Sequence, residues 1–203
     1  HLFLAFDHND VAAYEDQGIK WDWDNPPWDW ENPRMKSVYK YLDHACANDM
    51  EVVLTDWGWS LWTFFKTDPN VHSSADPTDP RFTKAIAHYV DYLINTKGYT
   101  CIKYLVVGNE PDNEISSQLG FEDYITMIKN MKTALTEKNL NNQVSLLGPD
   151  MGWFWPYFLD GVDYLKDTVD VYDFHWYPYS NEISNSGLSN PSDTLWAHLD
   201  RAR

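Results

Sequence analysis

The apolar positions of this 203-residue chain follow two alternating periods. Short runs that are apolar almost throughout predict buried strands at residues 2–6, 51–57, 102–107, 144–148 and 169–177. The stretches that follow them carry apolar residues at three- and four-residue spacing, which predicts helices at residues 35–48, 81–95, 121–138, 155–166 and 192–203. The pattern is therefore a strand followed by a helix, repeated along the chain.

Each of the first three predicted helices has one apolar face that we expect to pack on the sheet. The expected faces are Val38, Tyr41, Leu42, Ala45 and Cys46 in the first helix, Phe82, Ile86, Tyr89, Val90 and Leu93 in the second, and Tyr124, Ile128, Met131 and Leu135 in the third. Lys97 and Gly98 fit the end of the second helix, because glycine is the residue that commonly terminates one.

Continuous apolar strands separated by helices predict an α/β fold with a parallel sheet. No glycine-rich phosphate-binding motif follows the first strand, which argues against a dinucleotide-binding fold. The longest and most aromatic connections follow strands rather than helices. That asymmetry favours a (β/α)-barrel, in which the loops at the carboxyl ends of the strands build the active site. Residues 1–203 are accordingly interpreted as one segment of a single barrel domain.

Polar and aromatic side chains stand at the carboxyl ends of several predicted strands. In chain order they are Asp7 and His8, Asp56 and Trp57, Asn109 and Glu110, Asp150, and His175 with Trp176 and Tyr177. A barrel with no site would need none of them there. Because these ends meet at one face of a barrel, the sequence predicts that they gather around a common site.

Glu110 is the strongest candidate for chemistry in the acidic segment GNEPDNE, residues 108–114. It follows a strand directly and would act as a general acid if apolar walls raised its pKa. Asp112 and Glu114 are interpreted as solvated loop charges. An alternative is that the whole segment is only an acidic turn in an unrelated α/β binding module. Loss of Glu110 would then leave every function unchanged.

The composition narrows the class of ligand. The formal net charge of −16 disfavours nucleic acid and anionic membranes as partners, since both would be repelled. A neutral ligand such as a sugar is compatible with this charge. The 11 tryptophans are more than a core alone usually needs, and indole rings also make binding platforms. Trp57, Trp153 and Trp176 are the expected platforms, and about half of the loop tryptophans are expected to pack instead.

Metal and cysteine chemistry are only weakly indicated. The chain has no H-E-x-x-H motif and no Cys/His cluster, so neither a metal nor a cofactor is predicted. The acidic loop at residues 22–33 lacks the glycine and terminal glutamate of an EF-hand, although a loose Ca²⁺ site there remains open. Cys46 and Cys101 are the only cysteines, and two buried thiols are favoured over a disulfide.

A strand that ends in GNEPD, followed two strand–helix units later by a strand that ends in FHWYPY, resembles clan A glycoside hydrolases. These are retaining (β/α)₈ TIM-barrel enzymes that cleave β-linked oligo- and polysaccharides. The resemblance runs from about the second strand to the sixth helix. It implies that Glu110 is the acid/base and that Asn109 binds the sugar 2-hydroxyl. It also implies that His175 and Tyr177 line the subsite of the cleaved sugar and that Tyr177 orients the nucleophile.

The chain departs from the clan pattern in what it lacks. The clan's nucleophile is a second glutamate at the end of the seventh strand, and retaining chemistry needs the two carboxyls about 5–5.5 Å apart. Strands one, seven and eight are not visible, and no arginine ends the second strand. We therefore expect the nucleophile outside this chain, with the rest of the barrel supplied by the same gene or by a second chain. The isolated segment is expected to be inactive.

Two further expectations follow from this interpretation. The alternative to an enzyme is a catalytically inactive barrel that binds carbohydrate. A secreted or extracellular location follows from the class of substrate and not from a visible signal peptide.

Overall fold

The computed structural model describes residues 2–4, 28–56, 78–111, 121–152 and 155–175. Within these residues, a parallel sheet has the strand order β1-β2-β3-β4-β5. Its strands are Leu2–Leu4, Val52–Asp56, Ile102–Val107, Ser145–Met151 and Val171–Phe174. Every strand pairs in parallel with the next one along the chain, so the predicted parallel α/β sheet is confirmed.

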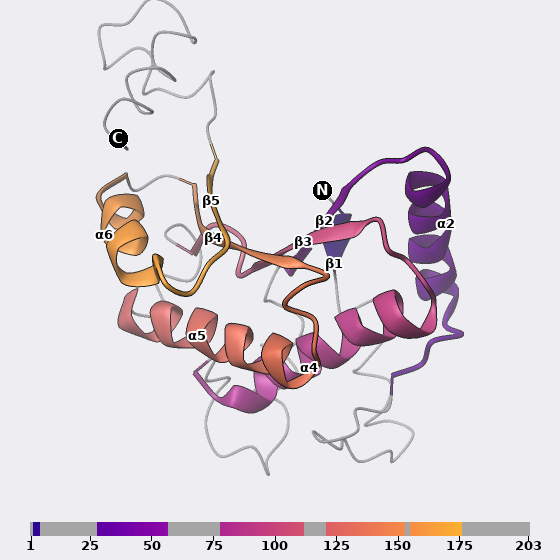
Figure 1. Ribbon diagram of the computed structural model, residues 1–203, viewed down its shortest axis with the longest axis horizontal. Coiled ribbons are helices and arrows are strands. Elements are labelled where there is room, and N and C mark those ends of the chain that lie inside the picture. Colours follow the sequence, from indigo (N-terminus) through magenta and orange to yellow (C-terminus); the bar gives the residue numbers. More distant parts are fainter. Residues whose placement is uncertain (1, 5–27, 57–77, 112–120, 153–154, 176–203) are drawn as a thin grey trace, which may run out of the picture.

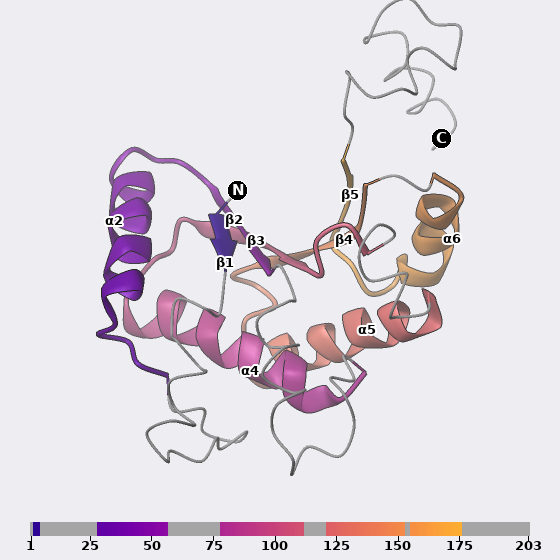
Figure 2. The same ribbon diagram turned by 180° about the vertical axis from the view of Figure 1, so that it is seen from behind.

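The helices alternate with the strands and lie outside them. They are α2 (Pro33–Ala47), α4 (Pro80–Asp91), which continues as the π-helical turn η2 (Tyr92–Thr96), α5 (Phe121–Glu137) and α6 (Trp155–Leu165). In Figure 1 they form an arc from α2 to α6, with the strands on its inner side. Figure 2 shows the same arc from behind, with α4 and α5 side by side. The helix predicted at residues 192–203 lies outside the described residues.

Local sequence signals set the ends of the first two helices. The side chains of Asn32 and Asp79 each accept a hydrogen bond of 2.9 Å from the backbone N–H two residues later, and a proline follows each cap. The predicted stop after the second helix is confirmed. Gly98 has a φ of +81°, and its N–H donates to the carbonyl of Ile94 at 3.1 Å.

The apolar faces predicted for the second and third helices are confirmed, because all nine residues named for them are buried in the core between helices and sheet. The face predicted for the first helix is wrong at one position. Tyr41 is 67% exposed, and its neighbour Tyr39 is buried in its place. The hydroxyl of Tyr39 donates to the carbonyl of Trp30 at 2.9 Å, and its ring stacks near that of Tyr99. These partners lie outside the helix, so helical spacing alone did not distinguish the two tyrosines.

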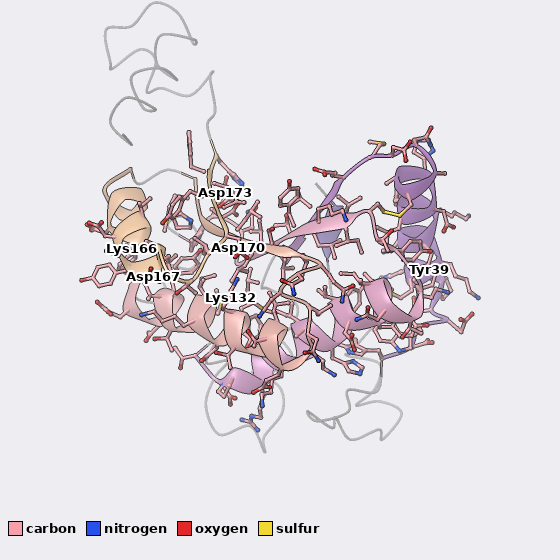
Figure 3. All side chains as sticks on the ribbon, in the orientation of Figure 1. Tyr39, Lys132, Lys166, Asp167, Asp170 and Asp173 are labelled. Carbon is pink, nitrogen blue, oxygen red and sulfur yellow. A yellow bond between two sulfur atoms is a disulfide. The ribbon has the colours of Figure 1, made fainter. Side chains whose placement is uncertain are left out.

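The predicted pair of free thiols is also wrong, because Cys46 and Cys101 form a disulfide. It joins the end of α2 to the residue before β3, and it appears as the yellow bond in Figure 3. The parallel sheet places β2 beside β3, which brings the two cysteines to a Cα–Cα distance of 5.1 Å. Their separation of 55 residues gave no sign of this proximity in the sequence.

Two of the loop tryptophans pack against α4 and η2. The ring of Trp30 stacks on that of Tyr92 at 3.7 Å, and Trp28 meets the ring of Tyr89 edge-on at 5.4 Å. Trp28 is buried in the core cluster. The packing role expected for part of the tryptophans is thus confirmed for these two.

Candidate functional site

The chain that leaves β3 turns sharply and buries Asn109 and Glu110. Both residues are only 7% exposed, so Glu110 is no solvated turn charge. Gly108 has a φ of +81° and Glu110 has a φ of +47°. The left-handed region is sparsely populated by residues other than glycine and costs free energy, so neighbouring groups must hold Glu110 in place. Asp112 and Glu114 lie outside the described residues.

The end of β4 reaches the same place through an irregularity in the sheet. The strand runs to Met151, three residues beyond the predicted end at residue 148, and its register with β5 shifts between Pro149 and Met151. Asp150 lies at this shift, with a φ of +52° and a fully buried side chain. Irregularities of this kind redirect a side chain locally and are common beside active sites. Here the redirected side chain is a carboxylate.

His175 directly follows β5, which is shorter than the predicted strand at residues 169–177. Its backbone N–H donates to the carbonyl of Met151 at 2.7 Å. Its ring Nδ1 lies 2.7 Å from Oε1 of Glu110, and its Nε2 lies 3.1 Å from Oδ1 of Asp150. Three predicted site residues from three successive strand ends therefore meet, as the sequence indicated.

Asp150 and Gly152 hold Glu110 from the side of β4. The backbone N–H of Glu110 donates to Oδ2 of Asp150 at 3.2 Å. A Cβ placed on Gly152 would lie 2.7 Å from Cδ of Glu110, closer than real side chains allow. Only glycine therefore permits this approach of the β4 backbone to the Glu110 carboxyl group.

The two carboxylates around His175 control its protonation. A neutral imidazole has one N–H, so it can present a proton to only one of two flanking carboxylates, whereas the charged ring presents an N–H to each. The Asp150 carboxylate, followed by that of Glu110, outweighs the effect of burial and raises the pKa of His175 to about 9. At neutral pH a proton is thus retained between the ring and the carboxylates.

Asp173 belongs to the same group of side chains but was not predicted from the sequence. Its Oδ1 accepts a hydrogen bond from the backbone N–H of Asp150 at 3.1 Å. Burial, together with the adjacent Asp150 carboxylate, raises the pKa of Asp173. A signal was present, because an acid in the apolar strand VYDF two positions before His175 lies on the same strand face as the histidine. We call Glu110, Asp150, Asp173 and His175 the acidic cluster.

The α5 helix supports the strand end that carries Asp150. The hydroxyl of Tyr124 is buried and donates to the carbonyl of Pro149 at 2.9 Å. This contact joins the helix layer to β4 one residue before Asp150. The position of the acidic cluster is therefore fixed by packing against the core as well as by the loops.

The remaining predicted site residues are placed only in part. Asp56 ends β2 and is aligned with Val107 of β3, so its backbone lies at the same edge of the sheet as the acidic cluster. The other expected residues lie outside the described part of the chain: Asp7, His8, Trp57, Trp153, Trp176 and Tyr177. The residues of the possible calcium loop before Trp28 also lie outside it.

Among the described residues, no group of three or more His, Cys, Asp or Glu side chains is arranged to hold a metal ion. None of the helices in the described ranges combines the length and apolar character needed to cross a membrane. Compared with models of known protein families, and with curated proteins, the chain gives no match.

The chemistry open to the acidic cluster is proton transfer. The contact between Nδ1 of His175 and Oε1 of Glu110 is short enough for one proton to lie on either atom. With the proton on the oxygen, Glu110 is an acid. With the proton on the nitrogen, it is a carboxylate that is able to accept one. Since Glu110 is 7% exposed, bulk water does not dominate this exchange.

Proposed function

We propose that this chain carries the acid/base part of a retaining β-glycosidase on a (β/α)₈ barrel, and that its substrate is a β-linked oligo- or polysaccharide. The observation that carries the proposal is the 2.7 Å contact between His175 and the buried carboxyl group of Glu110. This contact lies where the carboxyl ends of three parallel strands meet. Catalytic residues of (β/α)₈ enzymes come from this face of the barrel.

The proposed reaction has two steps. In the first, Glu110 gives its proton to the departing glycosidic oxygen while a second carboxylate bonds to the anomeric carbon. In the second step, Glu110 takes a proton from the water that displaces this carboxylate, which returns the site to its starting state. The second carboxylate would be supplied from outside this chain, about 5–5.5 Å from Glu110. Neither step requires a cofactor.

The other predicted residues take supporting roles in this proposal. Asn109, buried beside Glu110, would hydrogen-bond the sugar 2-hydroxyl. Tyr177 would orient the nucleophile, and the tryptophans at the strand ends would stack on sugar rings. The arc of helices outside a parallel sheet in sequential strand order supports a barrel segment. The rest of the barrel would be supplied by the same gene or by a second chain.

The disulfide supports a secreted or extracellular location for the proposed enzyme. Disulfides persist mainly in oxidising compartments, and polysaccharide substrates are commonly met outside the cell. The bond between Cys46 and Cys101 agrees with that setting.

The test of the proposed function is Glu110→Gln in the intact protein, assayed on β-glucan, xylan and mannan. The amide keeps the shape of the side chain but cannot supply the proton, so hydrolysis should fall by about 10²–10⁴-fold. The matched control is Glu122→Gln, because Glu122 is an exposed carboxylate in the first turn of α5. This control should retain full activity.

A second substrate separates the loss of an acid from the loss of the fold. A 2,4-dinitrophenyl β-glycoside releases a phenolate that needs no protonation, so Glu110→Gln should impair the bond-breaking step far less on it. Equal losses on both substrates would contradict the acid/base role. Binding of polysaccharide by the wild-type protein without any hydrolysis would instead identify a carbohydrate-binding barrel.

A further inference from the structure

Asp150 contacts Glu110 at both ends of that residue. At the backbone end, its Oδ2 accepts from the N–H of Glu110 at 3.2 Å. At the side-chain end, its Oδ1 lies 3.1 Å from Nε2 of His175, whose Nδ1 lies 2.7 Å from Oε1 of Glu110. The contacts close a ring that begins and ends at Glu110. Asp150 has no exposed surface, so its carboxylate faces protein groups and not an open substrate cleft.

The backbone at both residues is held in an unfavourable conformation. Glu110 and Asp150 have φ values of +47° and +52°, which are unfavourable for residues other than glycine. Such conformations persist only where surrounding groups over-determine them. The hydrogen bond from Glu110 N–H to Asp150 is one such group, and the shift in register beside Asp150 directs its side chain to this bond.

We propose that Asp150 is the positioning residue of Glu110, which it holds directly through the backbone N–H and indirectly through His175. By keeping a proton on Nε2 of His175, Asp150 leaves the exchangeable proton in the contact between Nδ1 and Oε1. This catalytic consequence rests on the proposed glycosidase function, whereas the positioning itself rests on the geometry. Asp150 thus acts through His175 and Glu110 and does not bind sugar, unlike the substrate contact expected from the sequence.

The proton count of the ring balances through the proposed reaction. Before the first step, Nε2 carries one proton and the Nδ1–Oε1 contact holds a second. When Oε1 gives the second proton to the departing oxygen, a Glu110 carboxylate is left beside a neutral His175 that still carries the Nε2 proton. The attacking water then restores the missing proton to the contact.

Among the described residues, the groups that act on the titration of His175 are all acidic. They are Glu110 after β3, Asp150 on β4 and Asp173 on the histidine's own strand, β5. The raised pKa of Asp173, caused by burial and by the neighbouring Asp150, favours a proton on that group at neutral pH. Its Oδ1 meanwhile accepts from the N–H of Asp150. Asp150 is therefore the group that lies against Nε2, and Asp173 accepts a hydrogen bond from its backbone N–H.

The test is an NMR titration of the His175 ring nitrogens in the wild-type protein and in Asp150→Asn. In the wild type, the pKa raised by Asp150 and Glu110 should lie near 9. The amide removes the charge at nearly constant shape, so the midpoint should fall by at least about one pH unit towards the ordinary histidine value. Asp163→Asn removes an exposed carboxylate on α6 and should leave the midpoint unchanged.

An unchanged His175 midpoint in a folded Asp150→Asn protein would overturn the proposal. If that variant fails to fold, the tautomer of His175 in the wild type still tests the proposal. The proposal requires that the neutral ring carries its proton on Nε2. A neutral ring protonated on Nδ1 overturns the proposal equally. Neither measurement uses substrate, so an absence of glycoside hydrolysis by the intact protein would refute the proposed function alone. If hydrolysis is observed, Asp150→Asn should lower kcat with little change in KM.

Discussion

The strand β5 has an aspartate near each end, Asp170 and Asp173, both labelled in Figure 3, and the two have different neighbours. Asp170 precedes the strand, lies 2.7 Å from the ammonium group of Lys132 on α5, and accepts from the N–H of Leu146 at 2.8 Å. Asp173 lies within the strand, where its Oδ1 accepts from the backbone N–H of Asp150 and the side chain of Asp150 contributes to its raised pKa.

The comparison separates the end of β5 that stabilises the sheet from the end that carries the groups suited to proton transfer. At the amino end, opposite charges and a backbone hydrogen bond stabilise the pairing of β4 with β5. At the carboxyl end, several carboxyl groups are buried together beside left-handed backbone, and both features oppose folding. Proteins tolerate such locally unfavourable features mainly at functional sites. The carboxyl end of β5 is therefore typical of a functional site.

The largest expected effect on stability is at the amino end. Asp170→Ala removes the partner of Lys132 and the acceptor for Leu146, so it should lower the free energy of unfolding by about 1–2 kcal/mol in urea denaturation. The His175 titration should be unchanged. Glu31→Ala breaks an exposed ion pair with Lys36 and should cost less than about 0.5 kcal/mol. A shift of the His175 midpoint in Asp170→Ala would show that the two ends are not separate.

The next prediction concerns the close contact between Gly152 and Glu110 at the carboxyl end of the sheet. In Gly152→Ala the new methyl group would push the Glu110 carboxyl away from His175, because its Cβ position is 2.7 Å from Cδ. The loss of this contact should lower the pKa of His175. For the proposed glycosidase function, it should also reduce hydrolysis by about tenfold, or ~1.4 kcal/mol in barrier.

The control for that variant is Gly98→Ala. Its φ of +81° makes alanine strained, although no atom lies within 4 Å of the added carbon. It should therefore lower stability by about 1 kcal/mol and leave the His175 titration intact. Equal behaviour of the two glycine variants would argue that Gly152 affects only the stability of the backbone.

The smallest effect is on the pH dependence of stability. Burial and the Asp150 carboxylate raise the pKa of Asp173 above its unfolded value, so the unfolded chain loses this proton first. The group therefore subtracts stability as the pH rises above the ordinary aspartate range and through its folded pKa. Asp173→Asn keeps an acceptor for Asp150 N–H and removes this penalty. Relative to wild type, it should gain on the order of 1 kcal/mol between pH 5 and pH 9.

Urea denaturation at the two pH values measures this gain, with Asp163→Asn as the exposed control on α6. The sign is the decisive result. A variant that becomes less stable than wild type as the pH rises would mean that Asp173 is ionised in the folded protein and stabilises its neighbours.

The sequence predicted the element order and most helix faces, because periodicity reports directly which side of an element is buried. It predicted β3 at residues 102–107 with the bounds that the structure has. It also predicted that Glu110, Asp150 and His175 would come together, since all three follow parallel strands. Strand ends were less well predicted where the sheet is irregular, as at Asp150, because a shift in register has no simple periodic signal.

The residues that sequence analysis misjudged depend on partners outside their own helix or strand. Tyr39 replaces Tyr41 in the core because Trp30 and Tyr99 meet it there. Cys46 and Cys101 are bonded because β2 and β3 are neighbours. Asp173 was read as one residue of an apolar run, and only the fold shows its side chain against the backbone of Asp150.

The sequence by itself determined the alternation of strands and helices, the strand end that carries Glu110, and an acidic composition that disfavours nucleic acid. These features depend on local periodicity and on summed charge, which are written in the order and number of the residues. Only the tertiary structure decided that Glu110 is buried, that His175 lies between two carboxylates, and that Asp150 contacts Glu110 from both ends. These features depend on distances between residues that are 40 and 65 positions apart, and only folding brings such residues together.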